Sequence, residues 1–148
     1  MKTLLIAINA KYEHESLAVW CLNAACHRHH ITTKVQQYSI NDSMQRIWAS
    51  ILEETPDVAA FSCYIWNREL IVKLIGDLKK ARPECTIIVG GPEVSYDGSE
   101  KEFHPIGADF VVKGEGEERL PLILRAIAEQ DLNHAKEILE KPVVCIKR

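Results

Sequence analysis

The sequence has no long hydrophobic run, no excess of charge of one sign and no paired arrangement of cysteines. No apolar run approaches the ~20 residues that a membrane-spanning helix needs, and the short run at the N-terminus is interpreted as a first strand. The net charge is -3, with acids and bases interspersed, which provides neither a nucleic-acid footprint nor a polybasic membrane patch. Five scattered cysteines fit a reducing cytoplasm. We therefore predict a cytoplasmic protein that binds no nucleic acid and no membrane.

Two catalytic and cofactor motifs are also absent. The chain has no G-x-S-x-G elbow, and no cysteine has an obvious histidine partner in a matching loop, which argues against nucleophilic catalysis. The first strand is not followed by G-x-G-x-x-G, so the pyrophosphate of a dinucleotide has no predicted place on the following helix.

The 148 residues have an ordinary globular composition, 47% hydrophobic and 26% charged, and the length suits one domain. Strand-like runs alternate with runs of helical spacing along the whole chain. The predicted strands are residues 3–8, 32–38, 57–63, 86–89 and 109–112. The predicted helices are residues 16–27, 44–51, 71–78 and 120–127, with Asn67 as the cap of the third and a short helix or turn at 102–103.

Strands that alternate with helices predict a parallel sheet covered on both faces. We predict a flavodoxin-like, doubly wound α/β fold: a five-stranded parallel sheet of order 2-1-3-4-5 in a Rossmann-like three-layer α/β/α arrangement. Ligands of such folds bind beyond the carboxyl ends of the strands. The segments that follow the strands are therefore the candidate site.

Polar groups, glycines and aromatic rings follow these strands. Ser62 and Tyr64 follow the third, Gly90-Gly91-Pro92-Glu93 the fourth and Gly114-Glu115-Gly116 the fifth. Each feature alone has an ordinary explanation, since glycine permits a turn, acids suit a helix start and aromatics pack. Glycine also allows a ligand to approach the backbone, and the shared edge of the sheet favours a binding site.

Histidines offer two further candidates. His14 follows the first strand and is either a polar residue at a helix start or a metal ligand, including a cobalt ligand. The tract at residues 27–30 is either a solvated helix end or a metal site without acidic or cysteine partners of suitable spacing. A phospho-acceptor receiver domain shares the strand order, but the third strand ends in Ser62 and the acidic pair after the first strand is absent.

Four segments together resemble the N-terminal cobalamin-binding domain of radical S-adenosylmethionine proteins: AINAKYEHESLA, AAFSCYIWN, IIVGGPEVSYD and FVVKGEGEE. The resemblance runs from about residue 3 to 129. It implies cobalamin as the cofactor, with Ser62 bonding the nucleotide tail and Gly90 and Gly91 giving the tail bare backbone to pass. It further implies that Pro92 fixes the exit of the chain, that main-chain groups of Gly114, Glu115 and Gly116 meet cofactor oxygens, and that Tyr64 and Tyr12 are walls of the site.

Two departures from the family pattern limit what this chain does alone. Many cobalamin domains have D-x-H-x-x-G after the first strand, whereas His14 has Tyr12 before it and Leu17 after it. No C-x-x-x-C-x-x-C occurs, so an iron–sulfur cluster and S-adenosylmethionine belong to a missing partner domain. We predict a cobalamin-binding-like domain at residues 1–129 and a linker, or the start of a following domain, at residues 130–148.

The resemblance implies a cofactor-carrying domain that is not catalytic by itself, with methyl transfer or radical chemistry performed by a downstream radical S-adenosylmethionine domain of the same protein. Two alternatives remain. One is a flavodoxin-like interaction or substrate-recognition domain that has lost cofactor binding. The other binds a small phosphorylated or nucleotide ligand at the Gly114 helix start.

Overall fold

Five apolar runs form one parallel sheet, in the computed structural model that describes residues 1–11 and 16–140. The elements follow each other as β1 (Thr3–Asn9), α1 (Leu17–Arg28), β2 (Lys34–Ser39), α2 (Met44–Glu53), β3 (Val58–Ser62), α3 (Arg68–Ala81), β4 (Thr86–Gly90), the 3-10 turn η1 (Pro92–Val94), α4 (Ser99–Phe103), β5 (Phe110–Val112), α5 (Gly116–Ala128) and α6 (Leu132–Glu140). The predicted strands and helices are all present, with ends shifted by a few residues.

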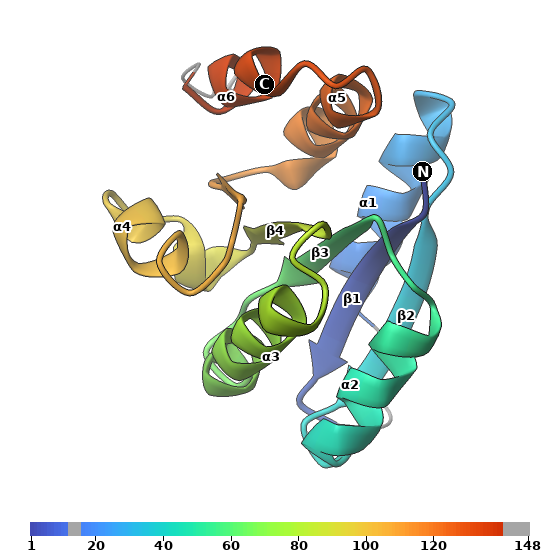
Figure 1. Cartoon of the computed structure of the whole chain (residues 1–148), viewed down its shortest axis with the longest axis vertical. Helices are drawn as coiled ribbons and strands as arrows, with labels where there is room; N and C mark the ends of the chain where they lie inside the picture. The colour runs from blue at the N-terminus through green and yellow to red at the C-terminus, as the bar shows by residue number, and fades with distance from the viewer. Residues whose placement is uncertain (12–15, 141–148) are drawn as a thin grey trace.

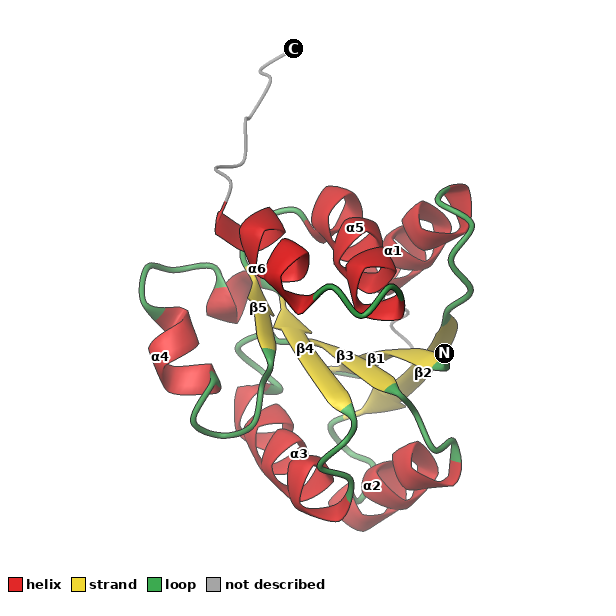
Figure 2. Ribbon diagram, turned by 45° about the horizontal axis from the view of Figure 1, so that its top comes forward, coloured by secondary structure: helices red, strands yellow, loops and turns green. Residues whose placement is uncertain are grey.

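The strand order is β2-β1-β3-β4-β5, and every pair is parallel. Helices α2 and α3 cover one face of the sheet, while α1, α5 and α6 cover the other (Figures 1 and 2). This confirms the predicted doubly wound fold of three layers. All strands point the same way, so their carboxyl ends meet at one edge of the sheet.

Alternation along the strands divides the core in two. In β1, Leu4, Ile6 and Ile8 pack toward α2 and α3, whereas Leu5 and Ala7 pack toward α1 and α5. A sheet buried on both faces needs apolar residues at successive positions, which explains the continuous apolar run of this strand.

Serine side chains cap the starts of α1 and α2. Ser16 Oγ accepts from Val19 N at the start of α1, and Ser43 Oγ accepts from Arg46 N at the start of α2. Asn67 stands at the predicted start of α3, but its side chain does not cap the helix. The prediction was right about the position and wrong about the interaction.

Asn67 instead joins the ends of two strands to the loop that follows β3. Its side chain is buried and accepts a hydrogen bond from Tyr64 N at 2.8 Å. Its amide nitrogen donates to Ile8 O at 2.9 Å and to Ser62 O at 3.2 Å. The β3–α3 loop is thereby held against the carboxyl ends of β1 and β3.

Helix α6 packs on the domain and buries Ala135 and Ile138 in the core on the α1–α5 side. Arg119 of α5 donates to Leu139 O at 3.2 Å. The residues predicted to form a linker or the start of another domain therefore begin with a helix that shares the core, and residues 141–148 lie outside the described part. None of the helices in the described ranges has the length and apolarity to cross a membrane.

We expect Asn67→Asp to lower the free energy of unfolding by about 3 kcal/mol, because a buried oxygen would face two carbonyl oxygens in place of the amide donor. Urea denaturation followed by circular dichroism measures this. Asn41→Asp is the control: Asn41 is exposed, so its replacement should change the value by no more than about 0.5 kcal/mol. Equal effects of the two changes would contradict the proposed role of Asn67.

The ion pairs of Glu54 should make the stability of the protein depend on pH in the acid range. Hydrogen bonds from Lys2, at 2.6 Å, and from Lys34 lower the pKa of the Glu54 carboxyl from 4.5 to about 2. Because the folded-state pKa is depressed, the ion pairs stabilise the protein above pH 4.5 and lose this effect as the pH falls toward 2.

The difference in urea midpoint between the natural protein and Glu54→Gln should therefore be largest near neutral pH and should shrink as the pH is lowered through this range. Glu53→Gln changes the exposed neighbouring carboxyl and should show a much smaller dependence. A difference that stays constant with pH would contradict the assignment.

Candidate functional site

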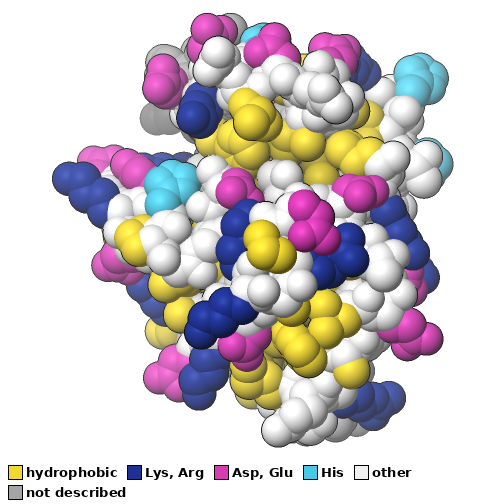
Figure 3. Space-filling view, in the orientation of Figure 1, with side chains coloured by type: hydrophobic (Ala, Val, Ile, Leu, Met, Phe, Trp, Pro, Cys, Tyr) yellow, Lys and Arg dark blue, Asp and Glu magenta, His cyan; other side chains and the backbone are white. Residues whose placement is uncertain are grey.

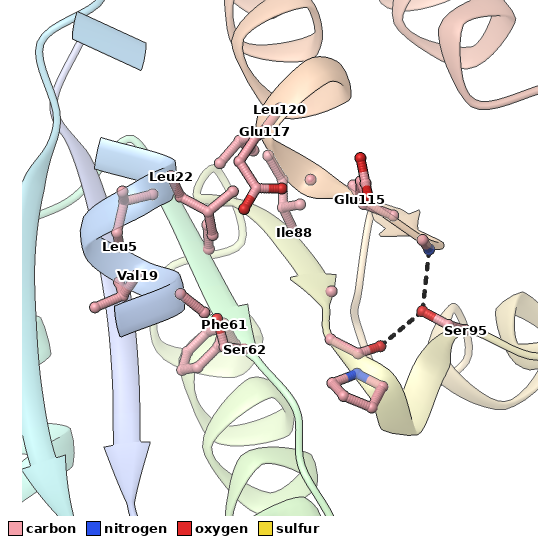
Figure 4. Close-up of a pocket in the computed structure, with 18 of the residues that line it drawn as sticks. Leu5, Val19, Leu22, Phe61, Ser62, Ile88, Ser95, Glu115, Glu117 and Leu120 are labelled. Carbon is pink, nitrogen blue, oxygen red and sulfur yellow. Dashed lines mark hydrogen bonds between the residues drawn. The ribbon is translucent and has the colours of Figure 1, made fainter. Parts of the chain in front are cut away.

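A pocket opens at the carboxyl edge of the sheet, between the sheet and helices α1 and α5. Its volume is about 270 Å³. Figure 4 shows side chains of α1, the strands and α5 pointing into the same space, and hydrophobic side chains gather below α5 and α6 in Figure 3. We call it the carboxyl-edge pocket; its lining is Leu5, Ala18, Val19, Leu22, Ala60, Phe61, Ser62, Tyr64, Ile88, Gly90, Gly91, Pro92, Ser95, Val112, Gly114, Glu115, Gly116, Glu117 and Leu120.

The structure brings together every predicted site residue that it describes. The lining of the carboxyl-edge pocket includes Ser62, Tyr64, Gly90, Gly91, Pro92, Gly114, Glu115 and Gly116. The other two predicted residues, Tyr12 and His14, lie outside the described residues. That these side chains hold a cofactor remains a prediction.

Small residues at paired positions of two central strands create the opening. Ser62 pairs with Gly90, and Gly90 pairs with Val112. A Cβ atom on Gly90 would lie 3.5 Å from Val112 O, which is an ordinary contact. The backbone at Gly90 therefore tolerates a side chain, and its absence leaves space in the pocket.

Gly91 is required for a different reason. Its φ is +104°, and a Cβ atom there would lie 2.5 Å from Cys63 O and 2.8 Å from Cys63 N. Cys63 N donates to Gly90 O at 2.7 Å, and Glu93 N donates to Cys63 O at 3.2 Å. The second glycine of the pair thus lets the loops after β3 and β4 interlock.

Ser95 joins the loop after β4 to the loop after β5 on the other side of the opening, a role that its sequence context did not predict. Its hydroxyl donates to Gly91 O at 2.8 Å and accepts from Gly114 N at 3.0 Å (Figure 4). The apolar walls of the pocket, formed by Leu5, Val19, Leu22 and Leu120, were not predicted either. Their helical or strand periodicity marks them as core residues, and nothing in that periodicity separates a core position from a pocket wall.

The loop after β3 presents an ordered aromatic pair. The rings of Tyr64 and Trp66 stack with centroids 4.6 Å apart and planes 5° from parallel. Trp66 Nε1 donates to Ile8 O at 3.1 Å, which fixes the indole. Burial raises the pKa of the Tyr64 hydroxyl, and the Glu117 carboxylate adds to the shift. The phenol therefore stays protonated at neutral pH.

Glu93, which had no predicted role, belongs to a polar cluster that holds the loop after β4 against α3. Arg68 Nη1 donates to Glu93 O at 3.2 Å, and Arg68 Nη2 pairs with Glu102 at 2.5 Å. Tyr96 donates to the same Glu102 carboxylate, and Arg68 lies 5.3 Å from the centre of the Phe103 ring. Glu93 is thus a structural residue.

The three buried cysteines are not nucleophiles, and the described ranges hold no cluster of metal ligands. Burial raises the pKa of the Cys63 thiol to about 11, and likewise those of Cys26 and Cys85. These thiols are protonated at neutral pH and are poor nucleophiles. No group of three or more His, Cys, Asp or Glu side chains within residues 1–11 and 16–140 could hold a metal ion. The site is built for binding by shape and by a few polar groups.

The fold and the carboxyl-edge pocket define a doubly wound α/β domain with a ligand-sized pocket at the carboxyl ends of its strands. The family model of the B12 binding domain matches residues 3–124. The chain therefore belongs to the family of B12-binding domains, as the sequence resemblance predicted, and the family implies cobalamin as the ligand.

Two similar proteins are methyltransferases. The chain is 38% identical over 77 residues to 2-(S-pantetheinyl)-carbapenam-3-carboxylate methyltransferase of Streptantibioticus cattleyicolor, a match that covers 51% of this chain and 11% of that enzyme. It is 32% identical over 94 residues to the cobalamin-dependent radical SAM methyltransferase TokK of Streptomyces tokunonensis, covering 63% and 13%. The chain thus spans a small part of the length of the curated relatives it matches, and the B12-binding domains of its homologues sit within larger radical SAM enzymes.

Solved structures show the same fold in different settings. The cobalamin-dependent radical enzyme OxsB, with aqua-cobalamin and S-adenosylmethionine bound, matches with a TM-score of 0.67 at 18% identity over 88% of this chain and 19% of OxsB. The RcsB response regulator of Salmonella typhimurium matches with a TM-score of 0.64 at 13% identity over 99% of this chain and 70% of RcsB. The fold alone therefore does not identify the ligand.

The two neighbouring glycines should differ sharply when replaced. Gly91→Ala should lower the free energy of unfolding by about 3 kcal/mol, because the new methyl group meets the Cys63 backbone at a strained φ. Gly90→Ala should change it by less than about 1 kcal/mol, because its contacts are ordinary. Urea denaturation of both variants tests this pair, and a larger loss for Gly90→Ala would refute the backbone argument.

Proposed function

We propose that this chain is the cobalamin-carrying domain of a larger radical S-adenosylmethionine enzyme, with the nucleotide tail of the cofactor in the carboxyl-edge pocket. The observation that carries the proposal is the pocket itself. Ser62 and Gly90 pair side by side on the sheet and leave room in the pocket lining, in a chain of the B12-binding family. A cavity of about 270 Å³ admits part of the cofactor, not all of it.

The residues present fit the nucleotide tail. The bare Gly90 backbone supplies the room, and the Ser62 hydroxyl has no hydrogen-bond partner among the described residues and is available to the tail. The backbone N–H groups of Glu115 and Gly116 stand where α5 begins and suit phosphate or amide oxygens, whereas Gly114 N already donates to Ser95 Oγ. Tyr64 borders the opening as a wall for the corrin side of the cofactor.

Cobalamin would supply a cobalt centre for methyl transfer or radical chemistry, and this chain would bind and orient it. The described residues hold no group of three or more metal-ligating side chains, and we place the iron–sulfur cluster and S-adenosylmethionine in a partner domain of the full-length protein. Exposed apolar side chains, Ile65 at 79% and Leu17 at 76%, support contact with such a partner. Free cysteines are consistent with a reducing cytoplasm.

Cobalamin retention tests this proposal. The purified chain is mixed with hydroxocobalamin, free cofactor is removed by gel filtration, and the visible spectrum is recorded. The natural chain should retain the corrin absorbance at micromolar protein. Gly90→Val should lose most of it, because the valine side chain would occupy the pocket while suiting a strand.

Thr86→Val is the matched control, since it places the same residue at the other end of β4, away from the pocket. It should retain cobalamin like the natural chain, and both variants should keep the circular dichroism of the natural fold. Absence of corrin from the natural chain would refute cofactor binding by this domain and would favour the alternative of an interaction domain that has lost it. Full retention by Gly90→Val would refute the placement of the tail.

A further inference from the structure

Polar and apolar groups of the carboxyl-edge pocket are separated by depth. The polar side chains belong to residues at or beyond the strand ends: Ser62 ends β3, Ser95 follows η1, and Glu115 and Glu117 lie at the start of α5. Farther from the carboxyl edge, on the same face of the sheet, the lining is apolar. Ala60 and Ile88 pair with each other there, and Leu5 pairs with Ala60.

Apolar side chains of two helices complete the inner part of the carboxyl-edge pocket. Val19 and Leu22 of α1 face the sheet, and Leu120 comes from α5 one turn beyond its start (Figure 4). The strand backbones there are paired in the sheet. Among the described residues, the inner wall therefore offers no side-chain donor or acceptor. A ligand group that reaches this inner part of the pocket leaves water and is surrounded by hydrocarbon side chains.

We infer that the carboxyl-edge pocket discriminates among cobamides by their lower base, accepting an apolar benzimidazole or phenol and disfavouring a purine. This inference rests on the proposed function. The six-membered ring of a benzimidazole has only carbon atoms, and a cresol ring ends in a methyl group. Adenine instead has an amino group and ring nitrogens, which would lie unpaired against Ala60, Ile88 and Leu120.

The polar groups at the opening do not change this expectation. The hydroxyl of Ser95 already donates to Gly91 O, so it can only accept. The Ser62 hydroxyl is a single donor at the opening, enough for one ring nitrogen near the sugar. Glu117 is an acceptor in the first turn of α5, and its carboxylate raises the pKa of the Tyr64 hydroxyl, which borders the opening. Purine nitrogens deeper in the pocket remain without partners.

Titration of the chain with four corrinoids tests the inference: hydroxocobalamin, the p-cresol-base cobamide, the adenine-base cobamide and tail-less cobinamide. The decisive comparison is cresol against adenine, because a cresol base cannot coordinate cobalt and adenine coordinates it weakly, so both tails enter without breaking a strong bond. Dissociation constants come from the change in the visible spectrum. The cresol cobamide should bind at least about tenfold more tightly than the adenine cobamide, as expected from leaving a polar group unpaired.

A matched pair of variants locates the effect. Ala60→Ser adds one hydroxyl to the inner wall of the pocket and should reduce the preference for cresol over adenine several-fold. Ala59→Ser adds the same hydroxyl on the opposite face of the sheet and should leave the preference unchanged.

The outcomes separate the two proposals. Equal affinity for the cresol and adenine cobamides would overturn the inference and would mean that a group such as Glu117 reaches the base, while cobalamin binding would still stand. Cobinamide binding as tight as that of the cresol cobamide would also overturn it, because the tail would then lie elsewhere. Failure of all four corrinoids to bind would overturn the proposed function and the inference together.

Discussion

The interlocked loops at the ends of β3 and β4 set the shape of the site. Cys63 exchanges backbone hydrogen bonds with Gly90 and Glu93, and its backbone lies where a side chain on Gly91 would be. These contacts are made by main-chain atoms. The loop after β4 therefore packs against the end of β3 without any side chain of Gly90 or Gly91 between them. The floor of the pocket is left to Ser62 and Gly90, whose small size then becomes decisive.

The two faces of the sheet differ in how completely side chains fill the core beside them. On the α2–α3 side, Ile8, Phe61 and Val89 fill the core up to the carboxyl edge. On the α1–α5 side, large side chains such as Ile123 and Leu124 fill only the deeper part, and the side chains shrink toward the edge. Hydrophobic burial on one face and in the deeper part of the other stabilises the domain, which allows the part of the core next to the carboxyl edge to stay open.

Much of this was accessible from the sequence, because the strand and helix periods and the strand-end rule depend on local residues and on simple topology. These rules predicted the strand order and the position of Ser62, Tyr64, Gly90 and Gly114 at one edge of the sheet. They could not predict contacts between segments that are distant in the sequence. Asn67 looks like an ordinary cap and binds Ile8 O on another strand. Ser95 looks like any loop serine and connects two loops. Periodicity also does not separate Leu22 as a pocket wall from Leu22 as a core residue.

Small residues occupy register-paired positions at the carboxyl edge of this domain, at Ser62 and Gly90. A response regulator superimposes on it almost as well as a cobalamin-binding radical enzyme does, so the backbone arrangement does not choose the ligand. A receiver domain needs acidic side chains at the strand ends, whereas here β3 ends in Ser62 beside Gly90. An acid pair at these places would need solvation or a cation, and a large apolar pair would close the space between α1 and α5. Serine and glycine do neither, so the pocket at this edge stays open.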